Sequence, residues 1–234
     1  QHLFELLVMA HAARHLGARS VAVYAPYLAY SRQDQRYLNG EAVTSTLVTE
    51  LLERAGVNTL YTIDVHNRSV LTRYTVPAVN LTAADELARH FAARRLKKPL
   101  LVAPDDEDDA LERVKVAAKA IGGDYTFLEK RRNRRTGEIV TLEKRIDAKG
   151  RDVVIIDDII STGHTAANAA RLLKKMGAHR VFIGVTHALP QEGTLGLLRD
   201  AGVDEAVGTD SVPGEMAKVS TAPILVRALK SRQR

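Results

Sequence analysis

The stretch Val153–Thr165, VVIIDDIISTGHT, carries the strongest structural signal in the sequence. Its first four residues, 153–156, are all β-branched and predict a strand that is buried on both faces of a parallel sheet. Two carboxylates, Asp157 and Asp158, stand at the carboxyl end of this strand, and Ser161–Thr165 forms a small polar loop around a glycine. The following run, AANAARLLKK, has its apolar residues at helical spacing, so the loop is predicted to open a helix.

A strand end, a tight loop and a helix N-terminus together form a common kind of anion-binding site. Free backbone N–H groups point outward at the start of the helix, and the helix dipole favours negative charge there. Two carboxylates beside a phosphate pocket need a second role on the same ligand, and they suit the acceptance of hydrogen bonds from a pair of ribose hydroxyls. The plain alternative is an acid pair at a strand end followed by an ordinary turn.

The composition is that of an ordinary globular protein, with 45% hydrophobic and 26% charged residues. The absence of cysteine excludes a disulfide framework, a thiolate metal site and a cysteine nucleophile. No apolar run approaches the roughly 18 residues that a membrane span requires, and no signal-peptide pattern is visible. We therefore expect a cytoplasmic protein with no membrane partner.

The net charge of +6 is compatible with nucleic acid or with phosphorylated small molecules. Aromatic residues make up only 5% of the chain, and lysines and arginines are spread along its length. We therefore expect no nucleic-acid partner and attribute the basic surface to phosphorylated small molecules.

Strands and helices alternate along the 234 residues. This alternation predicts doubly wound parallel sheets that bind ligands at the carboxyl ends of their strands. Two domains fit, with a boundary near 80–82. The opening helix already has an apolar face, which suggests that the chain begins inside a domain. Besides the strand and helix above, the predicted strands are Ser20–Tyr27, Thr59–Val65, Leu100–Ala103, Tyr125–Leu128, Glu138–Glu143, Arg180–Thr186 and Glu205–Thr209, and the predicted helices are Leu3–Leu16, Thr44–Ala55, Ala84–Arg95, Asp109–Ile121, Thr194–Ala201 and Pro223–Lys230.

Polar motifs follow several of these strands. The loop 27–37, YLAYSRQDQRY, contains Arg32, Gln33 and Asp34 between tyrosines. A guanidinium beside an amide suits a purine or a phosphate, and tyrosines can shape such a pocket. A solvated polar loop explains this motif equally well when it is taken alone.

Two further strand ends carry possible metal ligands. His66 follows a strand in IDVHN, and Asp105 follows another in APD. Magnesium prefers oxygen ligands and keeps bound water, so His66 would act through or beside such water. The acids that continue the second motif, 106–109, are also suited to cap the helix that begins near Asp109.

These motifs resemble those of the ribose-phosphate diphosphokinases (phosphoribosyl diphosphate synthetases), and of the archaeal type in particular. The segment 127–139, FLEKRRNRRTGEI, is similar to the catalytic loop of that family, and 184–190 and 207–229 are similar to its C-terminal part. The central stretch alone also resembles the type I phosphoribosyltransferases. The resemblance covers nearly the whole chain but lacks the family's N-terminal segment.

The resemblance implies two phosphoribosyltransferase-like, doubly wound parallel-sheet α/β domains, the first of them incomplete. Residues 1–81 would form a partial ATP-binding half, with the C-terminal helix 223–234 packed on it, and residues 82–222 would bind ribose 5-phosphate. It further implies a homo-oligomer in which the ATP site lies at a subunit interface. The partners expected are therefore ATP, ribose 5-phosphate and further copies of the chain.

The implied reaction transfers the diphosphoryl group of Mg–ATP to the C1 hydroxyl of ribose 5-phosphate, giving phosphoribosyl diphosphate and AMP for nucleotide biosynthesis. Such a transfer needs positioned cations more than covalent chemistry. Taken residue by residue, the resemblance gives catalysis to Lys130 and Arg132, ATP binding to Arg32, Gln33 and Asp34, Mg²⁺ to His66 and Asp105, and ribose 5-phosphate to Arg132, Asp157, Asp158, Ser161, Thr162, Gly163, His164 and Thr165.

Two departures from the family pattern keep other functions open. His164 stands where a second glycine is usual, and the acids of PDDEDD replace glycines after Asp105. A non-catalytic member that regulates or scaffolds an active partner is one alternative, and a type I phosphoribosyltransferase is another. A basic hairpin tip or a nucleic-acid patch is the plain alternative for the cationic segment around Lys130.

Overall fold

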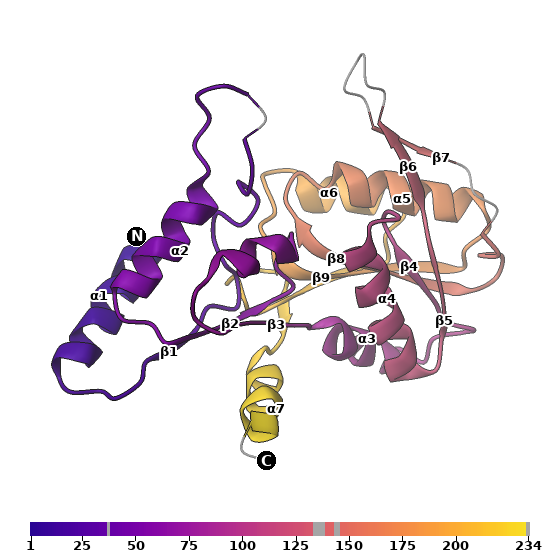
Figure 1. Ribbon diagram of the computed structural model, residues 1–234. Coiled ribbons are helices and arrows are strands. Elements are labelled where there is room, and N and C mark those ends of the chain that lie inside the picture. The colour runs from indigo at the N-terminus through magenta and orange to yellow at the C-terminus, as the bar shows by residue number, and fades with distance from the viewer. Residues whose placement is uncertain (37, 133–138, 143–145, 233–234) are drawn as a thin grey trace. The chain divides into compact units, whose positions relative to one another are not determined.

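The computed structural model of the chain describes residues 1–36, 38–132, 139–142 and 146–232, and for residues 130–132, 139–142 and 232 it describes the backbone alone. The chain divides into two compact units (Figure 1). The first contains Gln1–Leu81 together with the C-terminal segment from Ala222, and the second contains Thr82–Thr221. No helix in the described ranges combines the length and the apolar character needed to cross a membrane.

The first unit is built on a three-stranded parallel sheet with the order β1-β2-β3. Its core contains Leu52 and Leu60, both fully buried, packed with Val23 and with the inner face of α1. The C-terminal helix α7 contacts β3. The elements are α1 (His2–His15), β1 (Ala22–Tyr24), α2 (Thr44–Arg54), β2 (Thr59–Ile63), the 3₁₀ helix η1 (Arg68–Arg73), β3 (Ala78–Leu81) and α7 (Ala222–Arg232).

The sequence predicts β1 too long and does not predict β3 or η1. The predicted strand Ser20–Tyr27 contains Pro26, which has no N–H to give to a ladder. Its carbonyl still accepts a hydrogen bond from the N–H of Ile63 at 3.1 Å, but the chain bends at Pro26 and Tyr27, so strand β1 ends at Tyr24. Strand β3 is only four residues long and half-buried throughout, which leaves little pattern in the sequence.

The second unit is built on a six-stranded parallel sheet with the order β11-β10-β9-β8-β4-β5, so the decisive stretch, β8, lies inside the sheet. A separate antiparallel pair, β6 and β7, follows β5 in the chain. The elements are α3 (Ala84–Ala92), β4 (Leu100–Ala103), α4 (Asp108–Ile121), β5 (Asp124–Phe127), β6 (Glu129–Arg132), β7 (Ile139–Leu142), β8 (Asp152–Ile160), α5 (His164–Lys175), β9 (Arg180–Ala188), α6 (Thr194–Asp200), β10 (Glu205–Thr209) and β11 (Ala217–Val219).

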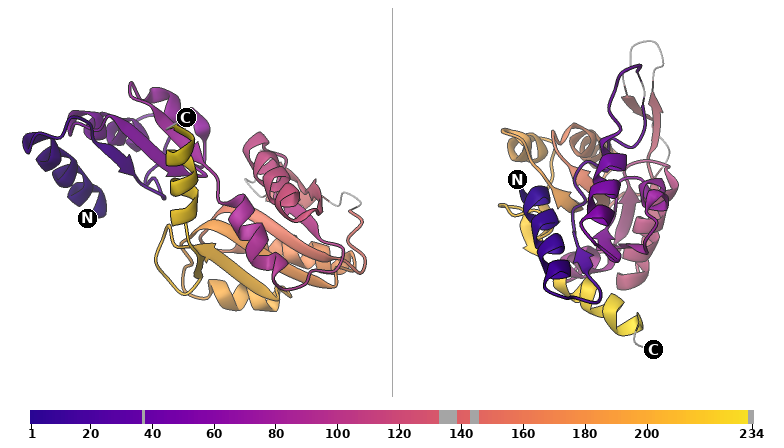
Figure 2. Two further views of the ribbon diagram at one scale, coloured as in Figure 1. Left: turned by 90° about the horizontal axis from the view of Figure 1, so that it is seen from below. Right: turned by 60° about the vertical axis from the view of Figure 1, so that its left-hand side comes forward.

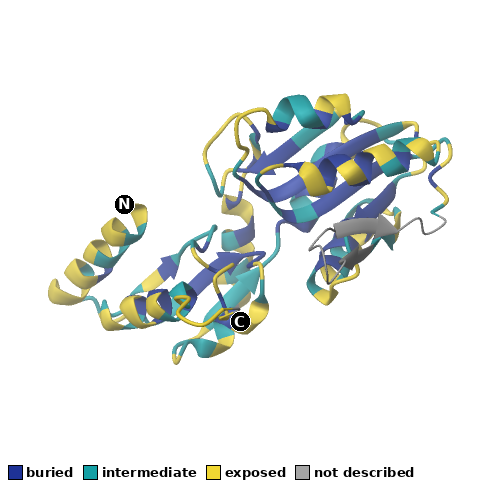
Figure 3. Cartoon of the chain, turned by 90° about the horizontal axis from the view of Figure 1, so that it is seen from above, coloured by how far each residue is buried: buried dark blue, intermediate teal, exposed yellow. Residues whose placement is uncertain are grey.

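Helices cover both faces of this sheet (Figures 1 and 2). Val153 and Ile155 belong to the same buried cluster as the alanines of α5. On the other face, Gly184 of β9 allows α3 to approach so closely that an added Cβ would lie 3.1 Å from Phe91. Burial on both faces is visible as the dark central strands in Figure 3, and it explains the uninterrupted β-branched run.

Strand β8 continues further than the sequence predicts. Asp157 and Asp158 lie inside it, whereas the sequence places them at its end. The β9 side of β8 stays paired through Ile160, while β4 pairs with β8 only as far as Ile155. The acid pair therefore lies where β8 extends beyond its shorter neighbour.

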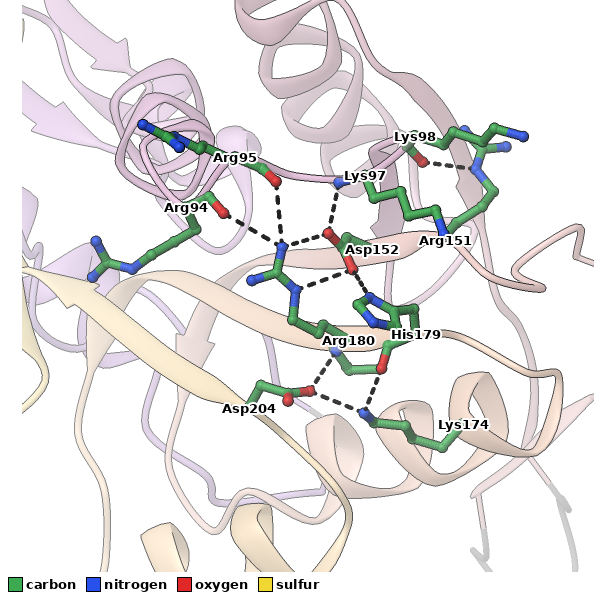
Figure 4. A network of polar contacts seen from close by, with 11 residues as sticks. Arg94, Arg95, Lys97, Lys98, Arg151, Asp152, Lys174, His179, Arg180 and Asp204 are labelled. Carbon is green, nitrogen blue, oxygen red and sulfur yellow. Dashed lines mark hydrogen bonds and ion pairs between the residues drawn. The ribbon is translucent and has the colours of Figure 1, made fainter.

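The amino ends of the strands carry a polar network (Figure 4). Asp152, the first residue of β8, is fully buried. It accepts hydrogen bonds from the N–H of Lys97 at 2.6 Å, from His179 at 2.7 Å and from Arg180 at 2.6 and 3.2 Å. This network ties the 94–98 turn to the first residues of β8 and β9, at the end of the sheet away from the acid pair.

Candidate active site

The acid pair of β8 faces a buried arginine. Arg113 of α4 is 7% exposed, and its Nη2 lies 3.8 Å from Asp158 Oδ1 and 4.0 Å from Asp157 Oδ1. The N–H of Asp158 also donates to Asp157 Oδ1 at 2.9 Å. Two carboxylates and one guanidinium thus form a compact charged group at the carboxyl ends of β8 and β4.

Electrostatics set Asp157 apart from ordinary surface acids. Burial raises the pKa of Asp157 well above its usual range, the neighbouring charge of Asp158 adds to the rise, and Arg113 opposes it. Asp105, just past β4, raises it further. The group therefore favours a ligand that brings hydrogen-bond donors or positive charge.

Asp105 lies beside this group, at the turn into α4. Its Oδ1 accepts a hydrogen bond from the N–H of Glu107 at 3.4 Å, and Glu107, the N-cap of α4, makes no side-chain capping bond. Of the acids 106–109, the one at the N-cap position, Glu107, therefore does not cap α4 with its side chain. Within the described ranges, no three histidine, aspartate or glutamate side chains are grouped closely enough to hold a metal ion. Carboxylate oxygens still suit Mg²⁺, which takes its remaining ligands from water and phosphate.

The polar loop follows β8 directly. Gly163 has φ = +78°, a conformation that side-chain-bearing residues rarely adopt, and α5 begins at the next residue. The first N–H groups of a helix have no acceptor within it, so 163–166 present donors to a bound anion. Thr162, His164 and Thr165 are exposed at this helix start, so the histidine side chain does not fill the loop.

The first unit brings its own candidate residues together. Arg32 and Gln33 are exposed, whereas Asp34 is buried. Asp34 Oδ2 accepts a hydrogen bond from the side-chain amide of Asn67 at 2.5 Å, and its carbonyl accepts one from Arg73. Asp34 therefore joins the loop after β1 to the segment after β2.

His66 lies on that segment. Asp64, buried at the end of β2, has φ = +40°, and the N–H of Val65 donates to Asn80 Oδ1 at 3.0 Å. These features turn the chain sharply, and His66 comes out exposed next to Asn67. Within the first unit, the structure therefore places His66 and the Arg32–Asp34 loop in one region.

Lys130 and Arg132 lie in β6, where they pair with Thr141 and Ile139 of β7. The sequence instead predicts a loop that begins at Lys130. The antiparallel pairing of β6 with β7 places Lys130 and Arg132 on a strand. The side chains of Lys130 and Arg132 lie outside what the structure describes.

Sequence reasoning missed Arg113. It occupies the same helix face as Ala110, Val114 and Ala117, all buried. A charged residue in an apolar helical stripe is a signal, because a buried charge requires a partner.

A parallel sheet whose central strand carries an acid pair and runs into a glycine loop and a helix defines a phosphoribosyltransferase-type domain. The family model described as the phosphoribosyl transferase domain matches residues 79–203, and the model for the N-terminal domain of ribose phosphate pyrophosphokinase matches residues 1–56. The chain belongs to the ribose-phosphate pyrophosphokinase family, the diphosphokinases of the sequence prediction.

Individual relatives agree with this. The chain is 37% identical over 232 residues to the ribose-phosphate pyrophosphokinase of Methanopyrus kandleri, covering 99% of this chain and 78% of the relative. It is 38% identical over 213 residues to that of Saccharolobus solfataricus, covering 91% and 72%. The crystal structure of phosphoribosylpyrophosphate synthetase from Mycobacterium smegmatis superposes with a TM-score of 0.79 at 26% identity, covering 99% of this chain and 77% of that one.

These similarities confirm the predicted family, fold class and enzymatic function. The chain is a ribose-phosphate diphosphokinase, a transferase that forms phosphoribosyl diphosphate and AMP from ATP and ribose 5-phosphate.

Proposed function

We propose that the second unit binds ribose 5-phosphate at the carboxyl end of β8. Asp157 and Asp158 accept hydrogen bonds from the two ribose hydroxyls, and Ser161–Thr165 holds the 5-phosphate with backbone N–H groups and hydroxyls. The observation that carries this proposal is the arrangement of the acid pair and the glycine loop on one continuous strand–loop–helix segment, with Arg113 behind the acids.

ATP binds to the first unit in this proposal. Arg32 and Gln33 are exposed and contact the nucleotide. Asp34 contributes by fixing the loop through Asn67 and Arg73. A guanidinium on an anchored loop suits phosphate or purine recognition because its donors have a fixed planar geometry.

Mg²⁺ is the proposed cofactor, and when bound it neutralises charge on the ATP phosphates. Asp105 of the second unit is a carboxylate suited to hold a Mg²⁺ ion. His66 of the first unit is suited to contact such an ion through its water, because an imidazole is a poor direct ligand for Mg²⁺. Lys130 and Arg132 stabilise the transferring diphosphoryl group, and Arg132 also contacts ribose 5-phosphate. No covalent intermediate on the protein is required. A cytoplasmic location stays a prediction from the sequence.

A direct assay tests catalysis by this chain. With ATP, Mg²⁺ and ribose 5-phosphate, we expect one AMP for each phosphoribosyl diphosphate formed, measured by chromatography. Product formation from a free base and phosphoribosyl diphosphate would instead indicate a phosphoribosyltransferase. Absence of turnover together with stable association with an active homologue would indicate a regulatory member.

The variant Arg32→Ala tests the ATP site. We expect the KM for ATP to rise roughly tenfold, since charge-assisted hydrogen bonds contribute about 1.5–3 kcal/mol, while the KM for ribose 5-phosphate stays unchanged. Arg36→Ala is the matched control, because Arg36 donates to the Glu41 carbonyl in the same loop at 2.8 Å. An equal effect of both variants on ATP would contradict the role of Arg32.

We also propose a homo-oligomer with its ATP site at a subunit interface. Exposed apolar side chains on α1 and α2 support the self-association. Phe4, Met9 and Leu47 are 71%, 62% and 53% exposed. Burial of such side chains against a second copy would remove apolar surface from water.

We expect Phe4→Glu to lower the oligomer mass measured by light scattering. Val226→Glu, an exposed site on α7, should leave the mass unchanged; a monomeric wild-type protein would contradict the proposal.

A further inference from the structure

The loop that follows β8 is supported from behind by the segment that leads into α6. Thr194, the first residue of α6, is 2% exposed, and its hydroxyl donates to the carbonyl of Ser161 at 2.9 Å. The N–H of Gln191 donates to the same carbonyl at 3.2 Å. Both lone pairs of this carbonyl are thus used by residues about thirty positions further along the chain.

The methyl group of Thr194 makes a second contact with the loop. A Cβ placed on Gly163 would lie only 2.8 Å from Thr194 Cγ2, and the next nearest atom, Leu198 Cδ2, would be 3.7 Å away. Thr194 therefore touches the loop on both sides of Thr162, at Ser161 through its hydroxyl and at Gly163 through its methyl.

These contacts fix the peptide groups on which anion binding depends. The peptide planes of 161–163 set the direction in which the next N–H groups point, and Thr194 restrains the first plane by a hydrogen bond and the last by packing. A loop that is held in its binding conformation loses less entropy when the ligand arrives.

We propose that Thr194 is a positioning residue for ribose 5-phosphate, which orders the 5-phosphate loop without touching the ligand. This inference rests on the proposed assignment of Ser161–Thr165 to the 5-phosphate. Its hydroxyl and its methyl have separate tasks, so the two can be removed one at a time.

Thr194→Val removes the hydroxyl and keeps the shape. We expect the KM for ribose 5-phosphate to rise roughly tenfold, the effect of one lost buried hydrogen bond, with kcat and the KM for ATP unchanged within about twofold. Thr194→Ser keeps the hydroxyl, and its KM for ribose 5-phosphate should stay within about threefold of the wild-type value. A normal KM for ribose 5-phosphate in Thr194→Val would overturn the proposal.

Thr49→Val is the matched control for a merely structural loss. Thr49 is a buried threonine of α2 whose hydroxyl donates to the Ser45 carbonyl at 3.0 Å. Both valine variants should lower the melting temperature, but only Thr194→Val should change the KM for ribose 5-phosphate. An equal change in both would reduce Thr194 to a structural role.

The contact with Gly163 is tested by a double-mutant cycle. Gly163→Ala should weaken ribose 5-phosphate binding, and adding Thr194→Ser should recover part of the loss because the clashing methyl is gone. Additive effects would contradict the contact.

Thr162→Ala tests the loop assignment separately from the role of Thr194. If Thr162→Ala leaves the KM for ribose 5-phosphate unchanged, the assignment of the loop to the 5-phosphate is wrong. If Thr162→Ala raises this KM but Thr194→Val does not, the loop assignment holds and only the positioning role of Thr194 is wrong.

Discussion

Asp157→Asn is expected to give an enzyme that is more stable than the wild type and roughly 100-fold less efficient with ribose 5-phosphate. The loss follows from one charge-assisted hydrogen bond to a ribose hydroxyl, which contributes about 1.5–3 kcal/mol, while Asp158 accepts from the other hydroxyl. The gain is expected at a pH above the raised pKa of Asp157, where the wild type holds two ionised carboxylates that repel each other in a largely buried place. Steady-state kinetics and thermal unfolding in EDTA without ligands measure the two effects separately.

Because of the raised pKa of Asp157, we expect the stability of the protein and its binding of ribose 5-phosphate to respond to pH in opposite directions. Burial and the charge of Asp158 hold the pKa of Asp157 well above its usual range, so this group binds more protons in the folded than in the unfolded state. Its contribution to stability therefore falls as the pH rises from the ordinary aspartate range through the raised pKa. Binding of ribose 5-phosphate should strengthen over the same interval, because the ionised carboxylate is the better acceptor.

Asp158→Asn is the control variant, because its expected effect on stability is opposite to that of Asp157→Asn. Asp158 is 5% exposed and lies 3.8 Å from Arg113, so its neutralisation weakens the charge balance of a buried guanidinium. We expect weaker ribose 5-phosphate binding in this variant too, but a lower melting temperature. If Asp157→Asn were also destabilising, the repulsion inferred for the pair would be wrong.

The sequence predicts the second unit well because its signals are local. The run 153–156 and the helices on both sides follow from side-chain chemistry and period alone. The extension of β8 through Asp157 and Asp158 does not, because acids are rare in buried strands. It depends on β4 ending at Ala103 while β9 continues to Ala188, and these lengths are set by pairing between segments distant in the sequence.

The candidate site shows the same division. Asp105, the acid pair and the glycine loop are found from their positions after strands. Thr194 has no such signal, since its contact with Ser161 joins residues 33 positions apart and the sequence indicates Thr194 only as the start of the predicted helix Thr194–Ala201. The inward direction of the Asp34 carboxylate toward Asn67 is likewise a tertiary feature, so the motif alone suggested only a ligand contact.

Asp152→Ala is expected to cost about 3 kcal/mol of stability while leaving catalysis at low temperature unchanged. Burial alone would raise the pKa of Asp152, but hydrogen bonds from Arg180, the N–H of Lys97 and His179 outweigh it and hold that pKa well below its usual range. Removal of this carboxylate leaves three donor residues, which make four hydrogen bonds to it, without their acceptor (Figure 4). Breaking a buried pair from one side costs roughly 3–5 kcal/mol, and the partial exposure of Arg180 places this case at the lower end.

Thermal unfolding measures this loss, with an expected fall in melting temperature of roughly 6–12 °C. Because the pKa of Asp152 is lower in the folded state, its contribution is complete above the ordinary aspartate range and is lost as the pH falls below it, so the difference between variant and wild type should shrink in acid. Asp204→Asn is the matched control at the same end of the sheet. The Asp204 carboxylate is 37% exposed and accepts from Lys174 at 2.9 Å and from the N–H of Val181 at 2.8 Å. Because asparagine keeps an acceptor oxygen for Val181, the variant loses the ion pair, and such exposed pairs contribute at most about 1 kcal/mol. If both variants lowered the melting temperature equally, the burial of Asp152 would not be what stabilises this end of the sheet. The hydrogen bonds that join the 94–98 turn to β8 would then contribute no more than an exposed ion pair.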